Sequence, residues 1–184
     1  MEPFAAFDTA TALLRSRLAA VGHAQWALPS SCAGWSVRDL ANHVIGTTER
    51  YALLMRGAAP GLLEPTHAYD YVADGALDAL DHHAGALRAL FARPGALART
   101  AAHRAGGVGG EELLGMSLIE QTVHAWDVAV STGGDTTLDE SLCAHVLALW
   151  TGSVDRLRQA GFYAEPTAPA DDSAQARLLA HAGR

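Results

Sequence analysis

The strongest constraint on the fold comes from the stretch SLIEQTVHAWDVA at residues 117–129. It lies inside a segment, about 111–132, whose apolar side chains are typical of a helix buried against its neighbours. Glu120, His124 and Asp127 interrupt this helix at i, i+4 and i+7, which places their side chains on one narrow stripe. The fold must therefore provide partners for two carboxylates and an imidazole inside a largely apolar environment.

Helical periodicity extends along most of the chain. Apolar residues recur at three- and four-residue spacing in four further long segments and one short one: 4–21, 36–56, 69–91, 139–159 and 172–182. Helices of about 20 residues span roughly 30 Å, a length that suits a bundle. We therefore predict an all-α fold in one domain over residues 1–184, a four-helix bundle with a C-terminal tail helix. The Gly-rich residues 95–110 are expected to form an irregular or β-hairpin insertion.

The composition excludes several classes of function. The net charge is −7 and every basic residue is a scattered arginine, which argues against a nucleic-acid surface or a membrane-binding patch. The sequence has no stretch of 18 continuous apolar residues for a membrane helix. Its first residues lack a basic region, so we expect no secretory signal. The distant Cys32 and Cys143 fit no metal pattern, and we expect both to be reduced in a cytoplasmic protein.

A capping box starts the second predicted helix. In SVRD, Ser36 can accept a hydrogen bond from the amide of Asp39, and the Asp39 carboxylate can accept one from the amide of Ser36. His43 follows about two turns into the chain segment, and Arg50 shares its face. The apolar neighbours of His43 indicate partial burial. The second helix thus offers an imidazole that could meet the polar stripe.

These polar residues predict a metal site, although other interpretations stay open. Glu120 and His124 can hold a cation between them, and His43 is the best third ligand. A site of two His and one carboxylate leaves coordination positions open, as in catalytic centres. The spacing also allows a favourable Glu–His helical pair and hydrogen-bonded core histidines. Asp127 could support a ligand, bind the metal or be a polar boundary residue, and Arg50 could clamp an anionic substrate or be solvated.

Two motifs resemble those of a known family. GWSVRDLANHV (34–44) and EQTVHAWDVA (120–129) are similar to the paired motifs of the DinB-like superfamily. They resemble more closely the N-terminal domain of mycothiol-dependent maleylpyruvate isomerase and its actinobacterial metal-binding relatives. The first motif has the form W-[ST]-V-x-D-L-x-x-H, and the second has an acidic residue, three positions and H-x-W-D. The resemblance extends over residues 4–160, and the arginine-rich, lysine-free composition fits a GC-rich genome.

The resemblance implies a DinB-like four-helix bundle that holds a divalent metal, usually zinc or nickel, on His43, Glu120 and His124. Glu120 stands where other DinB-like members carry a His. The fourth bundle helix would be the one predicted over 111–132 or the one over 139–159. The resemblance further implies a transferase or isomerase in which a low-molecular-weight thiol such as mycothiol attacks a small electrophile.

The isomerase has a further C-terminal domain that helps to shape its active site, whereas here a short tail follows the bundle. Two other functions therefore stay open: a metal-dependent hydrolase that uses no thiol, and a non-catalytic bundle that binds a metal or a small ligand. The expected partners are a small-molecule substrate and the thiol, without nucleic acid or membrane. We expect a monomer or a homodimer.

Overall fold

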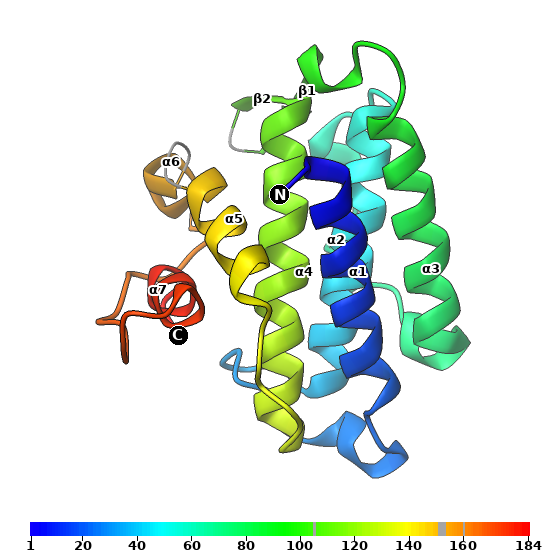
Figure 1. Cartoon of the computed structure of the whole chain (residues 1–184). Coiled ribbons are helices and arrows are strands. Elements are labelled where there is room, and N and C mark those ends of the chain that lie inside the picture. The colour runs from blue at the N-terminus through cyan, green and yellow to red at the C-terminus, as the bar shows by residue number, and fades with distance from the viewer. Residues whose placement is uncertain (105, 151–153, 160) are drawn as a thin grey trace.

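The computed structural model describes residues 1–104, 106–150, 154–159 and 161–184. Four long helices form a bundle (Figure 1): α1 (Pro3–Ala19), α2 (Val37–Met55), α3 (Tyr71–Phe91) and α4 (Gly110–Thr132). Both α1 and α2 pack against α3 and α4, so the four helices enclose one apolar core. The predicted all-α four-helix bundle is confirmed.

The insertion before α4 is a β-hairpin that lies at one end of the bundle (Figure 1). Strand β1 (Thr100–His103) pairs antiparallel with β2 (Gly106–Gly109), so that Thr100 lies opposite Gly109. The connections of the bundle also contain three short 3-10 helices: η1 (His23–Ala27), η2 (Pro60–Leu62) and η3 (Ala96–Ala98). The hairpin predicted within 95–110 is confirmed, and it brings its residues close to the end of α2.

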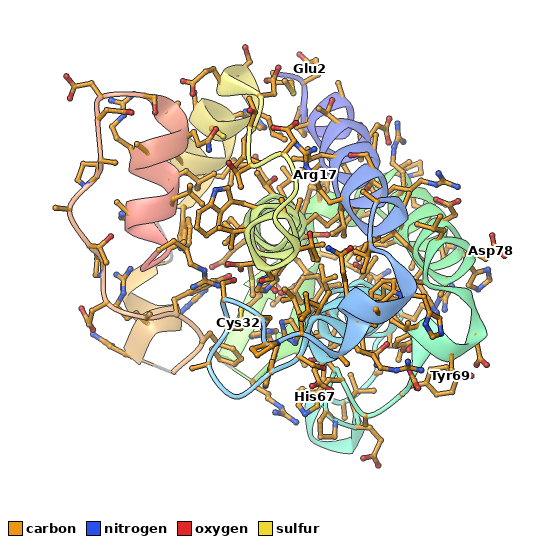
Figure 2. The ribbon with its side chains drawn as sticks, turned by 90° about the horizontal axis from the view of Figure 1, so that it is seen from below. Glu2, Arg17, Cys32, His67, Tyr69 and Asp78 are labelled. Atoms are coloured by element: carbon orange, nitrogen blue, oxygen red, sulfur yellow. The ribbon has the colours of Figure 1, made fainter. Side chains whose placement is uncertain are left out.

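Three further helices cover the outer side of α4: α5 (Glu140–Trp150), α6 (Val154–Gln159) and α7 (Ala174–His181). Figure 2 shows α4 end-on, with α5 and α7 on one side of it and the other bundle helices opposite. The predicted tail helix is therefore present as α7. The single helix predicted over 139–159 runs through residues 151–153, which lie outside the described residues.

The position of α4 explains its unusual composition. It contacts α1 and α2 on one side and α5 on the other, and α7 packs on α5. A helix enclosed in this way needs apolar side chains around most of its circumference. The fourth helix of the bundle is therefore α4, and α5 is an outer helix.

The starts of two helices are set by side-chain caps. Ser36 Oγ accepts from the amide of Asp39 at 3.1 Å, and the amide of Ser36 donates to the Asp39 carboxylate at 2.9 Å, so the predicted capping box is present. It fixes the first turn of α2, which carries His43. The helix α3 begins at Tyr71, two residues later than predicted, because the side chain of Asp70 accepts from the amide of Ala73 and ends the preceding loop.

Within the residues that the structure describes, no helix combines the length and the apolar character needed to cross a bilayer.

Candidate metal centre

Three side chains from two helices converge on one point between α2 and α4. The Nε2 atom of His43 lies 3.3 Å from Oε2 of Glu120, and Nε2 of His124 lies 3.2 Å from the same oxygen. One ligand atom from each residue lies within 4.8 Å of those of the other two. The tertiary structure thus brings together the three residues that the sequence analysis selected as metal ligands.

The other nitrogen of each imidazole is held by a separate partner. His43 Nδ1 is hydrogen-bonded to Thr66 Oγ1 at 2.6 Å, and His124 Nδ1 is hydrogen-bonded to Asp127 Oδ2 at 2.9 Å. Metal-binding histidines commonly have this arrangement, in which the bond at one nitrogen fixes the ring so that the other nitrogen faces the ion. Both rings are therefore oriented with Nε2 toward Glu120.

Asp127 links His124 to the C-terminal segment. Its side chain is 0% exposed, and its two oxygens accept from Nε and Nη2 of Arg184, both at 2.7 Å. Ser31 Oγ donates to the same carboxylate at 2.7 Å. Asp127 also belongs to a second group of possible ligands with Cys32 and His124. Arg184 already donates to both carboxylate oxygens of Asp127. Asp127 is therefore better placed to orient His124 than to bind the metal itself.

Burial and charge act against each other in this cluster. Burial lowers the pKa of His43, although Glu120 opposes this effect. Burial would raise the pKa of Glu120, but hydrogen bonds from His124 and His43 hold it well below its usual range. Burial would also lower the pKa of His124, but hydrogen bonds with Asp127, Cys32 and Glu120 raise it well above its usual value. Two ionised carboxylates therefore flank His124, which favours a positive charge at this point.

The donor set fits a divalent transition metal. Two imidazole nitrogens and one carboxylate oxygen suit zinc or nickel, and three protein ligands leave at least one coordination position open. The three side chains are 12–20% exposed, so the point on which they converge can be reached from solvent. The residues present therefore fit a catalytic type of site better than a closed structural one.

Two cavities meet at these residues. One, of about 430 Å³, lies toward the C-terminal segment and is lined by His124, Cys32 and Tyr163. The other, of about 220 Å³, extends along α2 and is lined by Arg50. His43 and Glu120 line both cavities, as do Trp35 and Phe162. Arg50 and His43 line the same cavity, as expected for two residues on one face of α2.

Several residues contact the candidate site although no pattern in the sequence predicted this. Tyr163 Oη donates to Glu120 Oε1 at 3.3 Å, although the two residues are 43 positions apart. Arg184 and Thr66 contact the site from segments with no recognisable motif. Cys32 Sγ lies 3.7 Å from Asp127 Oδ2, and Figure 2 shows Cys32 on the loop beside α4. Spacing along one helix cannot reveal such contacts.

The chain matches the family model described as the mycothiol maleylpyruvate isomerase N-terminal domain over residues 7–129. This range includes α2 and all but the last three residues of α4, and with them all three candidate ligands. The chain belongs to this family. Two uncharacterised proteins from two strains of Mycobacterium tuberculosis are each 32% identical over 148 residues, which cover 80% of this chain and 77% of theirs.

The maleylpyruvate isomerase family also includes solved structures with this fold. The crystal structure of the mycothiol-dependent maleylpyruvate isomerase has a TM-score of 0.62 at 23% identity, and that of a point mutant has 0.61 at 21%. Each comparison covers 80% of this chain and 67% of the other. At this identity the likeness establishes the fold. The DinB-like resemblance identified from the two motifs is confirmed.

Proposed function

We propose that His43, Glu120 and His124 hold one divalent metal ion, zinc or nickel. The observation that carries this proposal is the convergence of two imidazole Nε2 atoms on a single oxygen of Glu120, at 3.3 and 3.2 Å. The Nδ1 atoms are held by Thr66 and Asp127, so the rings do not need to turn to bind a cation.

The proposed activity is that of a metal-dependent transferase or isomerase that uses a low-molecular-weight thiol of the mycothiol type and acts on a small electrophile. Its support is membership of the family and the name of the two solved structures, both of a mycothiol-dependent maleylpyruvate isomerase. A metal bound here would lower the pKa of a coordinated thiol and so supply a thiolate near neutral pH.

The chain's own residues have three tasks in this mechanism. Thr66 and Asp127 orient the imidazoles. Trp35, whose ring centroid lies 4.7 Å from that of His43, limits the access of water. Tyr163 donates a hydrogen bond to Glu120 and so holds the carboxylate in place. Positioning of this kind lowers the barrier of a reaction between two bound groups, because it holds them in a productive geometry.

Arg50 is the proposed contact for an anionic group of the substrate. Its Nη2 donates to the backbone oxygen of Glu64, which fixes the guanidinium at the wall of the smaller cavity. Because His43 and Glu120 line the same cavity, an anion bound near Arg50 would hold the rest of a small molecule close to the ligands.

Residues 1–184 are proposed to act as one domain in the cytoplasm. The C-terminal segment supplies Tyr163 and Arg184 to a site that α2 and α4 build, which favours a single unit. Cys32 and Cys143 are both free, as expected in a reducing compartment. All three candidate ligands come from one chain, so the site needs no second copy.

Metal content is the first test. Purified, tag-free wild-type protein should contain about one zinc or nickel per chain, measured by mass spectrometry, and His124→Ala should lose it. His23→Ala, which removes an exposed histidine outside both motifs, should retain the metal. Circular dichroism of each variant shows whether the bundle is folded. A wild-type protein that stays free of metal after addition of zinc at neutral pH would overturn the proposal.

Thiol dependence is the second test, made with the metal-loaded protein and a panel of small electrophiles. Turnover that requires both the metal and a thiol supports the proposed activity. Turnover that needs the metal but no thiol would identify a hydrolase instead. A protein that binds the metal and turns over no electrophile would be a non-catalytic binding bundle.

A further inference from the structure

A groove apart from the candidate metal centre is lined by α2, α3 and the loop that joins them. Its volume of about 780 Å³ lies within the roughly 300–1,000 Å³ that is usual for ligand pockets. Its lining in the described parts of the chain includes none of the three candidate metal ligands. In Figure 2, Tyr69 marks this side of the molecule, away from Cys32. The groove therefore has room for a second small molecule.

Three rings in the lining of the groove are inclined to one another. The ring centroids of Tyr69 and Tyr71 lie 4.8 Å apart with their planes at 57°, and those of Tyr71 and His83 lie 5.5 Å apart with their planes at 81°. Tyr69 is 55% exposed, so a ligand can reach its ring from solvent. Aromatic faces attract organic cations, and sets of rings form the walls of the cages that bind them.

Each tyrosine hydroxyl donates to a carboxylate of the groove and leaves the second oxygen of that carboxylate available. Tyr71 Oη donates to Glu49 Oε2, and Tyr69 Oη donates to Asp74 Oδ2. Within the described residues, Glu49 Oε1 and Asp74 Oδ1 accept no hydrogen bond, since His83 Nδ1 lies 4.0 Å from Glu49 Oε1. Two acceptor oxygens are thus left for a ligand with N–H groups.

The lining of the groove carries an excess of negative charge. Glu49, Glu64 and Asp74 contribute three carboxylates, against one guanidinium from Arg50. Nη2 of Arg50 donates to the backbone oxygen of Glu64, which holds this cation at the loop. Burial lowers the pKa of His83 although Glu49 opposes this effect, so the imidazole is neutral at pH 7 and does not balance the carboxylates.

The class of cation follows from the donor atoms. Among the described residues, both groups with the spacing of metal ligands lie at the candidate metal centre and neither lies in this groove. Aromatic walls combined with separate carboxylates suit an ammonium group on a carbon chain better than a bare metal ion.

The backbone of α3 bends beside the groove. Gly75 has φ 106° and ψ 88°, a conformation outside the helical range that favours glycine. The first turn of α3, which carries Tyr71 and Asp74, is therefore set off from the regular part of the helix, which carries His83. The bend sets the position of one ring and one carboxylate relative to the rest of the lining.

We infer that this groove binds a short aliphatic amine, whose ammonium groups pair with Glu49 and Asp74 and whose carbon chain packs on Tyr69 and Tyr71. An ammonium group donates up to three hydrogen bonds, which suits the available carboxylate oxygens. The inference goes beyond the proposed function and does not depend on it. Thr66, which is hydrogen-bonded to His43, also lines the groove, so a bound amine would lie beside the loop that orients a candidate ligand.

Calorimetric titration of the full chain with putrescine, a four-carbon diamine, tests the inference, with butanediol as its uncharged analogue. The diamine should bind at least about 10-fold more tightly than the diol, because charge-assisted hydrogen bonds are the stronger kind. Glu49→Gln keeps an acceptor for Tyr71 and should weaken binding of the diamine about 10-fold. Glu111→Gln removes the same charge from an exposed position on α4 and should change it less than about 2-fold.

Two variants of Tyr69 test the contribution of the ring. Tyr69→Leu removes the aromatic face and should weaken binding of the diamine about 3-fold, while Tyr69→Phe keeps the face and should bind more tightly than the Leu variant. Because Tyr69 is exposed, both variants should fold, which circular dichroism checks. Equal affinities of the two variants would contradict the packing of the amine on this ring.

Repeating the titration after chelator treatment separates this inference from the metal proposal. Since no candidate metal ligand lines the groove, the treated protein should bind the diamine as tightly as before. Equal binding of the diamine and the diol, equal weakening by Glu49→Gln and Glu111→Gln, or no binding at millimolar concentrations would overturn the inference.

Discussion

Thr66 Oγ1 lies 2.6 Å from His43 Nδ1, so a residue of the loop after α2 fixes the orientation of an imidazole inside the bundle. The loop can come this close because Gly46 has no side chain: a Cβ there would lie 1.9 Å from the backbone oxygen of Thr66. A small residue on the helix and a hydroxyl on the loop therefore act together on one candidate metal ligand.

Thr66→Val should lower the affinity for zinc by about 10-fold, because loss of a partner that orients a ligand typically weakens metal binding 10- to 100-fold. Competition with a chromophoric chelator measures this affinity. Thr66→Ser keeps the hydroxyl and should behave like the wild type. Equal affinities for the Val and Ser variants would show that the hydrogen bond to His43 has no orienting role.

Gly46→Ala should destabilise the protein by about 2 kcal/mol, because the new methyl group displaces the loop that holds Thr66. Urea denaturation measures the change in the free energy of unfolding. Gly85→Ala is the control: Gly85 is exposed in α3, a Cβ there would meet no atom within 4 Å, and this change should stabilise by about 0.5–1 kcal/mol. The prediction fails if both variants are stabilised.

Asp127→Asn should weaken zinc binding 10- to 100-fold, because His124 loses the carboxylate that holds its Nδ1. It should also destabilise the protein by about 3 kcal/mol, because the pair with Arg184 is largely buried. The double variant Asp127→Asn with Arg184→Gln should lose less than the sum of the single losses.

The exposed pair between Asp81 and Arg15 provides the control for this prediction. Asp81→Asn should change the free energy of unfolding by less than about 1 kcal/mol and leave zinc binding unchanged. Strict additivity in the double variant of Asp127 and Arg184 would contradict the interpretation that the two residues act as one unit.

Ser36→Ala should destabilise the protein by about 1 kcal/mol at pH 7, because α2 loses the cap at its first turn. Hydrogen bonds from Ser36 lower the pKa of Asp39 below its usual value near 3.9. Because folding lowers the pKa of Asp39, its ionised carboxylate stabilises the folded state. This contribution is present above the unfolded-state pKa and is lost as the pH falls below about 4.

Urea denaturation of wild type and Ser36→Ala at pH 7 and pH 3 measures both effects. The difference between the two proteins should be smaller at pH 3, and Ser36→Thr, which keeps the hydroxyl, should stay close to the wild type at both values. A difference that grows at pH 3 would contradict the role assigned to the Asp39 carboxylate.

The sequence by itself determined the four bundle helices, the cap of α2 and the candidate ligands, because these depend on short-range order. The spacing of apolar residues predicts α1 to α4 to within a few positions, and SVRD predicts the start of α2. One helical turn between Glu120 and His124 is enough to place them side by side. The place of His43 on the second helix made it the best third ligand, and the paired motifs then supplied the family.

The tertiary structure alone decided which distant segments meet. Packing placed α4 inside the bundle and α5 outside it, a choice that two equally apolar segments leave open. It also brought Thr66, Tyr163 and Arg184 to the site. Helical periodicity reports only which side of a helix is apolar, whereas these contacts depend on how loops and outer helices fill the space around the core, and that is settled by the packing of the whole chain.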